Sequence, residues 1–384
     1  MKLTNNRLYL DYNATAPLDE AVFKWLTEGV FPFGNPSSIH NSGKLSKKLI
    51  NSTRDYLFKV FKLHEHQLFF HSGATEGIND IIKGFCLKSM SLKENFHVVA
   101  FKSDHSCIVN QRDHVELLGG GFHLLDVDES GLYQEDEVIA FINSLDGRVL
   151  FNHTYINNET GVVWDLLKAQ KIKEATNCFI HVDAVQLIGK WKDIKLEDSI
   201  DSYTFSAHKF GGMKGVGFSF ISTGNDFNCS LIRGGGQQES LRSGTENVFG
   251  IYSIKLALES ILESFNFEKS LKNKEHLETT LLKRYADKIT IVGENSPRNA
   301  NTTYLIVKDV KTDILITAFD MAGIDLSSGS ACSSGAIKPS RVLMSMGFSE
   351  DEAKNSIRMS FSPKLDCMKE ATDKITKVFD RFLL

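Results

Sequence analysis

The stretch Asp201-Ser-Tyr-Thr-Phe-Ser-Ala-His-Lys-Phe-Gly-Gly-Met-Lys-Gly-Val-Gly217 decides how the rest of this sequence is interpreted. Tyr203, Phe205 and their neighbours predict a short strand that runs into Lys209, and glycines follow closely. A lysine at the end of a buried strand, with little backbone bulk around it, can be shielded from water. Its amine then loses its proton more readily and becomes a nucleophile toward carbonyl groups. Taken alone, the stretch fits an ordinary surface lysine beside a glycine turn equally well.

The composition is that of a globular protein, and 384 residues allow two domains and a large core. The formal net charge of -4 is small, so nothing indicates binding to nucleic acid or to an anionic membrane. No apolar run is long enough to span a bilayer, and the N-terminus lacks the apolar stretch of a signal peptide. Six dispersed cysteines without a CxxC pair disfavour zinc or iron–sulfur ligation and predict a cytoplasmic protein.

A second informative stretch is Gln67-Leu-Phe-Phe-His-Ser-Gly-Ala-Thr-Glu-Gly-Ile78. It predicts a strand over 68–70, a turn of small residues over 72–75 and a helix from Ile78. Backbone N–H groups at such a helix start converge on one spot, which suits a phosphate group. The commoner meaning of such a turn is a plain Ser or Thr helix cap.

Strands and helices alternate over the first two thirds of the chain. We expect helices over 19–30, 42–61, 135–143 and 166–177, and strands over 97–101, 122–125, 148–152 and 178–182. This alternation predicts an α/β fold with a mostly parallel, seven-stranded type of sheet flanked by helices. Ligands of such sheets collect at the carboxyl ends of the strands, and the residues that fall there are His105, Asn157, Asp183, Gln186 and Lys209.

The last third predicts a smaller α/β domain, with the domain boundary inside a long helical region over 249–287. Its expected elements are strands over 289–292, 302–307 and 356–360 and helices over 313–322, 341–346 and 367–382. We expect an N-terminal arm (1–15) that packs on this domain, a large cofactor-binding domain (16–260) and a small domain (261–384). The small domain carries Cys332 in a loop of very small residues, which packs poorly and can move.

Pyridoxal phosphate requires four features of a protein: a lysine, a phosphate cradle, an acid for its ring nitrogen and a wall against its ring. Lys209, the turn over 72–75, Asp183 and His105 can supply these in that order. Singly, Asp183 is more simply a cap at a strand end, and His105 a loop histidine with satisfied hydrogen bonds. Their common place at the strand ends of one sheet predicts a pyridoxal-phosphate site.

On these motifs the sequence resembles the cysteine desulfurases, pyridoxal-phosphate enzymes of the class V aminotransferase group with the fold type I architecture. The matching stretches span nearly the whole chain: Tyr9-Leu-Asp-Tyr-Asn-Ala-Thr-Ala-Pro17, Gly34-Asn-Pro-Ser-Ser-Ile-His40, Ser72-Gly-Ala-Thr-Glu76, Asn157-Asn-Glu-Thr-Gly161, His181-Val-Asp-Ala-Val-Gln186, Ser206-Ala-His-Lys-Phe-Gly-Gly212, Arg242-Ser-Gly-Thr245, Ser328-Gly-Ser-Ala-Cys-Ser-Ser-Gly335 and Ser356-Ile-Arg358.

The resemblance implies a role for each matching residue. Lys209 would hold the cofactor, Asp183 would pair with its ring nitrogen, and His105 would stack on the ring and shuttle protons at the substrate thiol. The further implied contacts are Ala74, Thr75, Ser206 and His208 at the phosphate, Asn157 and Gln186 at the phenolic oxygen, Thr245 at the phosphate of a partner subunit, and Arg358 with Asn35 at the substrate carboxylate. The role of Thr245 implies a homodimer with a shared active site.

Cys332 distinguishes this group from plain transaminases. The resemblance implies that its thiolate takes the sulfur of L-cysteine as a persulfide and that L-alanine is released. The sulfur would then pass to an acceptor protein, in iron–sulfur cluster assembly or tRNA thiolation. The other five cysteines, including Cys107, are interpreted as structural.

Three alternatives remain at this stage: a selenocysteine lyase, a transaminase or other lyase of the same fold that does not need Cys332, and a non-enzymatic scaffold. Met213 stands where the group usually has proline, for which we expect a small change in loop stiffness. The chain ends at Leu384, soon after the last expected helix, whereas housekeeping desulfurases carry a longer docking tail. The acceptor protein and the pathway therefore stay open.

Overall fold

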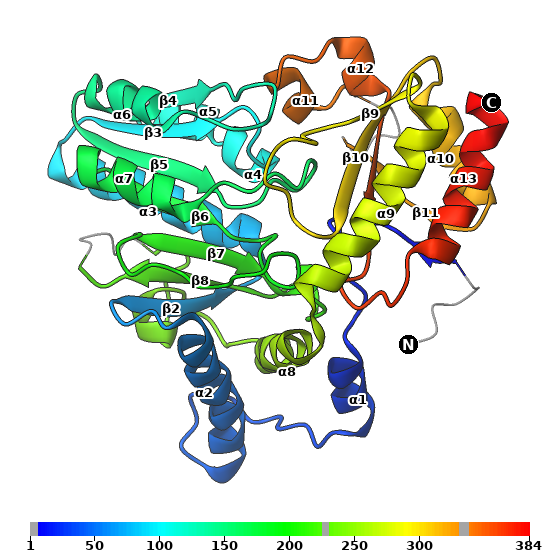
Figure 1. Cartoon of the computed structure of the whole chain (residues 1–384). Helices are drawn as coiled ribbons and strands as arrows, with labels where there is room; N and C mark the ends of the chain where they lie inside the picture. Colours follow the sequence, from blue (N-terminus) through cyan, green and yellow to red (C-terminus); the bar gives the residue numbers. More distant parts are fainter. Residues whose placement is uncertain (1–6, 225–229, 330–337) are drawn as a thin grey trace.

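The computed structural model describes residues 7–224, 230–329 and 338–384. Cys332, the predicted sulfur carrier, lies outside the described residues. The described chain forms a seven-stranded sheet, a four-stranded sheet and a two-stranded pair, with helices packed around them (Figure 1). In these ranges, no helix has both the length and the apolar character needed to cross a membrane.

The seven-stranded sheet lies at the centre of the larger part of the molecule. Its strands, in spatial order, are β2 (His66–His71), β8 (Gly217–Ser222), β7 (Ser202–Ser206), β6 (Phe179–Asp183), β5 (Arg148–Thr154), β3 (Phe96–Phe101) and β4 (Gly121–Leu125). Neighbours from β7 to β4 pair in parallel, whereas β8 pairs antiparallel with β2 and β7. This topology confirms the predicted α/β fold with a mostly parallel sheet.

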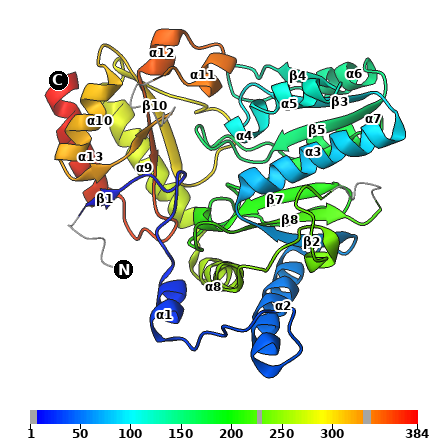
Figure 2. The same ribbon diagram turned by 180° about the vertical axis from the view of Figure 1, so that it is seen from behind.

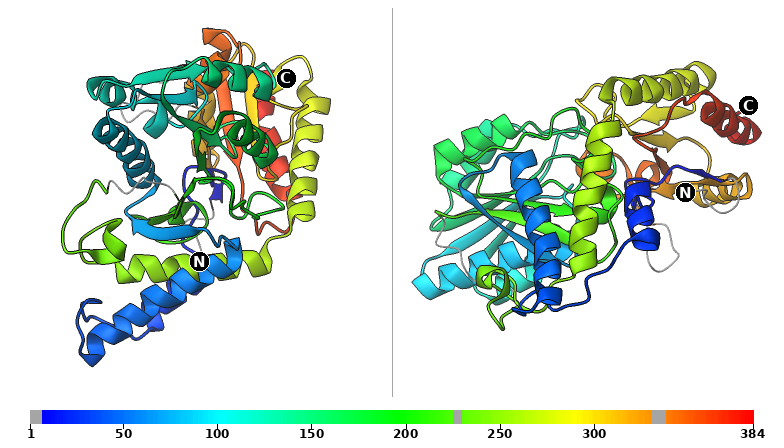
Figure 3. Two further views of the ribbon diagram at one scale, coloured as in Figure 1. Left: turned by 90° about the vertical axis from the view of Figure 1, so that its left-hand side faces the viewer. Right: turned by 90° about the horizontal axis from the view of Figure 1, so that it is seen from below.

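Both faces of this sheet are covered by helices, which explains why β3 is apolar from Val98 to Phe101. Val98 and Ala100 share a core cluster with α3, and Val99 and Phe101 share the core of the opposite face. Figure 2 shows α3 in front of the sheet, and Figure 3 shows α2 and α8 on the other side. The helices of this part are α1 (Glu20–Glu28), α2 (Asn41–Phe61), α3 (Ala74–Leu92), α4 (Ser106–Val109), α5 (Arg112–Leu117), α6 (Glu135–Asn143), α7 (Leu166–Thr176) and α8 (Val248–Ser264).

The last third of the chain builds a second layer with its own apolar core. Its antiparallel sheet has the spatial order β12 (Ser327–Ser328), β13 (Ser356–Ser360), β10 (Thr302–Val307) and β9 (Ile289–Ile291). The helices that pack on it in a common core are α9 (Phe267–Tyr285), α10 (Thr312–Met321) and α13 (Lys369–Leu383). The short helices α11 (Arg341–Ser345) and α12 (Glu350–Lys354) lie between β12 and β13 in the sequence.

The predicted helical region over 249–287 is two helices. α8 ends at Ser264, and Phe265 adopts an extended conformation. Asn266 then caps α9, because its side chain accepts a hydrogen bond from the backbone N–H of Lys269. The capping residue Asn266 therefore divides a helical region that hydrophobic periodicity alone predicts as continuous.

The N-terminal segment joins the two parts. β1 (Leu8–Tyr9) pairs in parallel with β11 (Ile324–Asp325), and Leu10 belongs to the core of the last third. The chain then crosses the strand ends of the large sheet, where the N–H groups of Ala16 and Asp19 donate to the carbonyls of His208 and Gly211. This path places the segment over the carboxyl end of β7.

Candidate active site

Lys209 lies in a short helical turn (Ala207–Lys209) directly after β7. Its Nζ donates to the carbonyl oxygens of Asn13 at 2.8 Å and Ala14 at 2.9 Å, both on the N-terminal segment. Burial, followed by the positive charge of Arg358, lowers the pKa of Lys209 to about 8. A substantial fraction of this amine is therefore neutral near physiological pH, as a nucleophilic lysine requires.

Asp183 ends β6, the strand beside β7, and its side chain is buried. One carboxylate oxygen accepts the backbone N–H of Val185 at 3.0 Å. Burial raises the pKa of Asp183 to about 6, while that N–H and the charge of Lys209 oppose the shift. A cation placed against this carboxylate would stabilise its charged form, which suits a protonated pyridine nitrogen.

The start of α3 offers an anion cradle next to the end of β7. Gly73 precedes the helix without a side-chain cap, so the first-turn N–H groups at Ala74 and Thr75 remain available. The Ser206 hydroxyl lies 4.0 Å from the point that a Cβ on Gly73 would occupy. His208 contacts the Thr15 hydroxyl through Nδ1 at 3.1 Å. Backbone donors and the Ser206 hydroxyl thus lie near one spot, and the His208 imidazole lies two residues further along the chain.

His105 precedes α4, just after the end of β3. Its Nδ1 accepts the backbone N–H of Cys107 at 3.2 Å, and the Cys107 Sγ lies 3.0 Å from the same nitrogen. Because a backbone N–H can only donate, the proton of the neutral ring resides on Nε2. The residue is partly open to solvent. Desolvation by the surrounding protein, followed by the positive charges of Lys209 and Arg341, nevertheless lowers the pKa of His105 to about 4.

Cys107 lines the site, although sequence analysis interprets it as structural. Its thiol hydrogen-bonds the Thr75 side chain and lies within electrostatic range of Asp183. Burial raises the pKa of this thiol, so it stays protonated. Its position two residues after His105 was the one sequence signal available, and a lone cysteine is usually a core residue.

Asn157 and Gln186 each use part of their amide hydrogen bonding within the protein. Asn157 Oδ1 accepts the N–H groups of Glu159 and Thr160, and its Nδ2 donates to the carbonyl of Ser103. Gln186 Nε2 donates to the carbonyl of Asn13 at 3.1 Å. Each amide therefore retains one N–H for a ligand.

Arg358 lies on β13 and is a residue that the last third of the chain contributes to the site. Its guanidinium donates to Asp11 Oδ1 at 2.8 Å, to Ser327 Oγ at 2.7 Å and to the carbonyl of Asn158 at 3.2 Å. Within the described residues, its buried Nε has no hydrogen-bond partner. An unsatisfied buried donor on a fixed guanidinium fits a carboxylate ligand.

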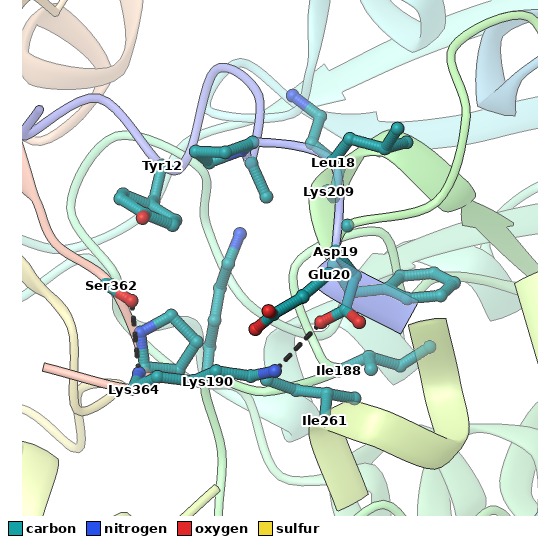
Figure 4. A pocket seen from close by; sticks show the side chains of 15 residues that line it. Tyr12, Leu18, Asp19, Glu20, Ile188, Lys190, Lys209, Ile261, Ser362 and Lys364 are labelled. Atoms are coloured by element: carbon teal, nitrogen blue, oxygen red, sulfur yellow. Dashed lines mark hydrogen bonds and ion pairs between the residues drawn. The ribbon is translucent and has the colours of Figure 1, made fainter. Parts of the chain in front are cut away.

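A cavity of about 230 Å³ adjoins Lys209 (Figure 4). Its walls include Tyr12, Lys190 and Lys364, and Lys364 pairs with Asp19 Oδ2 at 2.8 Å. Asn35 and Thr245 lie on exposed loops, and no interaction in the described part of the chain joins them to this cluster. The same ranges contain no group of three or more side chains arranged to hold a metal ion.

Comparison with known proteins shows the family to which the chain belongs. Residues 8–367 match the family model described as aminotransferase class-V. The chain belongs to the class-V aminotransferase family. Among curated members, it is 32% identical over 391 residues to a protein of Clostridium botulinum named cysteine desulfurase IscS, with 97% of this chain and 95% of that protein covered. It is 34% identical over 362 residues to a cysteine desulfurase of Nostoc sp., with 92% and 87% covered.

Solved structures of this family share the fold over the whole chain. A NifS-like protein from Rickettsia africae matches with a TM-score of 0.85 and 29% identity, covering 98% of this chain and 100% of that one. A second NifS-like protein matches with a TM-score of 0.86 and 27% identity, covering 98% and 99%. The resemblance to desulfurases and the fold type I architecture are thereby confirmed.

Proposed function

We propose that this chain is a pyridoxal-5'-phosphate-dependent cysteine desulfurase that converts L-cysteine to L-alanine and a persulfide on Cys332. The observation that carries this proposal is geometric: Lys209 follows β7, and Asp183 ends β6, the neighbouring parallel strand, so an amine and a carboxylate lie at adjacent strand ends. Membership of the class-V family and relatives named cysteine desulfurase at 32% and 34% identity support the same reaction.

The residues present fit pyridoxal 5'-phosphate. Lys209 would bind its aldehyde, Asp183 would face its ring nitrogen, and His105 would cover its ring. The phosphate would lie at the start of α3 among Ala74, Thr75, Ser206 and His208, with Asn157 and Gln186 donating to the phenolic oxygen. When bound, the cofactor supplies an electron sink for the bonds broken in the substrate.

The chain's own residues then position the substrate and move its protons. The fixed guanidinium of Arg358, with help from Asn35, would bind the substrate carboxylate. Lys209, once released, would remove the proton from Cα. His105 would exchange a proton at the substrate thiol.

Sulfur transfer belongs to Cys332. Its thiolate would form an S–S bond to the substrate sulfur while the Cβ–S bond breaks, so that alanine leaves and a persulfide remains. The persulfide would then pass its outer sulfur to an acceptor protein, in iron–sulfur cluster assembly or tRNA thiolation.

The organisation of the chain is part of the proposal. Residues 1–15 form an arm on the small domain, 16–260 the cofactor-binding domain, and 261–384 the small domain with Cys332. The separate apolar core of the last third, which includes Leu10, supports this division. We also infer a homodimer in which Thr245 reaches the phosphate of the partner's site, and a cytoplasmic location in keeping with the dispersed cysteines.

The proposal is tested by incubating the purified protein with pyridoxal 5'-phosphate, L-cysteine and a thiol reductant, and measuring alanine and sulfide together. The wild-type protein should give equimolar products, and Cys332→Ala should give neither. Cys367→Ala is the matched control, because Cys367 is an exposed free cysteine without a role in the proposed reaction and should not change turnover. Full activity of Cys332→Ala would contradict a desulfurase, as would bound cofactor without either product in the wild type.

A further inference from the structure

Lys190 is a fully buried lysine that the proposed reaction does not use. It follows β6 on the turn that carries Gln186, and only 1% of it is exposed. Its Nζ donates to Gln186 Oε1, and its backbone carbonyl accepts the N–H of Ala300. Among the described residues, no carboxylate forms an ion pair with its amine.

Such a lysine is costly to keep. A buried ammonium without a counter-ion is unfavourable, so burial, followed by the charges of Lys209 and Arg358, lowers the pKa of Lys190 far below its ordinary value. An apolar side chain of similar length would fill the same space without this cost. A specific task for the amine would explain why it is there.

The hydrogen bonds around Lys190 define that task. The Gln186 amide offers an oxygen and an NH₂ group that are similar in shape, so its neighbours decide which end points where. The Lys190 amine donates a hydrogen bond to the amide oxygen. The NH₂ group donates to the carbonyl of Asn13, which also accepts the Lys209 amine at 2.8 Å. Lys190 and Lys209 also line one cavity (Figure 4).

We propose that Lys190 is a positioning residue, which holds the Gln186 amide with its NH₂ end toward the cofactor. This inference rests on the proposed function, in which the remaining N–H of Gln186 donates to the phenolic oxygen. Without Lys190, the Asn13 carbonyl alone orients the amide, so the turned form, in which the amide oxygen faces another oxygen that carries negative charge, is populated more often. The donated hydrogen bond favours the deprotonated form of the bound cofactor, since that form has more charge on this oxygen.

The test compares Lys190→Met, Gln186→Leu and the double variant with the wild type, all saturated with pyridoxal 5'-phosphate. The readout is the pH midpoint of the cofactor's absorbance change. We expect Lys190→Met to move the midpoint up by about one pH unit, a tenfold change in the protonation equilibrium. Gln186→Leu should give a similar shift, and the double variant no further shift, because both variants remove the same interaction.

Three controls separate positioning from a structural role. Lys192→Met, at an exposed lysine two residues on, should leave the midpoint unchanged. Lys190→Gln keeps an N–H donor, so its midpoint should lie close to the wild-type midpoint. In the protein without cofactor, the double variant should unfold at the wild-type urea concentration or a higher one, since it removes both buried polar partners without leaving a cavity.

An unshifted midpoint in Lys190→Met, or shifts that add in the double variant, would overturn the positioning role. A marked loss of urea resistance in the double variant would also overturn it, because Lys190 would then serve the fold. A wild-type protein that develops no cofactor absorbance would overturn both this proposal and the proposed function. The two failures are therefore distinguishable.

Discussion

The Lys209 amine must lose its proton before it can attack an aldehyde. Burial and the charge of Arg358 lower its pKa to about 8 from an ordinary 10.5, so the neutral fraction falls about tenfold for each pH unit below 8. The same residue is held by two carbonyl groups, which keep the amine in place without neutralising it. The surroundings of Lys209 thus suit the proposed reaction.

We predict that the rate at which apoprotein binds pyridoxal 5'-phosphate covalently rises with pH to a plateau above about 8. Arg358→Gln removes a positive charge beside Lys209, so the pKa of Lys209 should rise and the midpoint should move to higher pH. Stopped-flow absorbance measures both. Arg341→Gln is the control, since Arg341 acts on the pKa of His105. A rate independent of pH between 6.5 and 9 would contradict the lowered pKa.

Met213 forms a backbone hydrogen bond that the sequence did not indicate. From the sequence, methionine in place of proline suggested a change in loop stiffness alone. In the structure the Met213 backbone N–H donates to Ser253 Oγ on α8 at 3.0 Å. Proline has no N–H, so the methionine ties the loop after Lys209 to a helix in a way that proline would not allow.

At the scale of elements, α9 is joined to the chain before β10 by a buried ion pair. Glu278 on α9 accepts two hydrogen bonds from Arg298, at 2.7 and 2.8 Å, and a third from the Thr303 hydroxyl at 2.9 Å. Both charged side chains are almost completely buried. Removing one partner would leave the other as an unpaired buried charge.

Glu278→Gln is therefore expected to lower the free energy of unfolding by about 3–5 kcal/mol. Urea denaturation followed by circular dichroism measures the change. Glu116→Gln, which breaks the exposed pair with Arg112, should cost about 0–1 kcal/mol and is the matched control. Equal losses of unfolding free energy in the two variants would show that burial does not increase the contribution of the Glu278 pair to stability.

Elements with a clear pattern could be predicted from the sequence. α6 and β10 begin and end at the expected residues, whereas α1, expected over 19–30, begins after its capping residue Asp19 and ends at Glu28. β8 was not predicted, because Gly215 and Gly217 are typical of a loop, although Phe218 and Phe220 alternate with smaller residues as in a strand. β1 and β11 have two residues each and exist because they pair with each other across most of the chain.

The candidate site divides in the same way. Lys209 and Asp183 could be predicted, because strand ends and polar residues are visible in a sequence. Cys107 and Lys190 could not, because neither a lone cysteine nor a lone lysine carries a local signal of the place that the fold gives it. The use of Asn13 as a carbonyl acceptor depends on a tertiary contact made through its backbone, which no side-chain motif records.

At the scale of the whole molecule, the segment between α1 and α2 exposes large apolar side chains. Val30, Phe33 and Ile39 are 93%, 89% and 90% exposed. Exposed apolar side chains gathered on one segment are typical of a surface that another chain covers. They support the proposed homodimer, in which Thr245 would complete the partner's site.

We predict that Phe33→Asp combined with Ile39→Asp produces a monomer with little desulfurase activity, because charges oppose burial and each site loses its partner's Thr245. Multi-angle light scattering after size-exclusion chromatography gives the mass, and alanine release gives the activity. Met321→Asp is the control, since Met321 is 84% exposed at the end of α10, on the small domain. A double variant that remains dimeric would place the interface elsewhere.

A ribosome releases Leu8 and Tyr9 early and reaches their strand partners, Ile324 and Asp325, near the end of synthesis. Arg7 and its hydrogen-bond acceptor Asp325 are 318 residues apart, so at roughly 5–20 residues per second the first segment waits roughly 15–60 s. That segment also carries the carbonyl groups that hold Lys209. Because Ser360 and Thr302 of the final third hold Asn13, the lysine pocket takes its final form only after that third has emerged, when translation is nearly over.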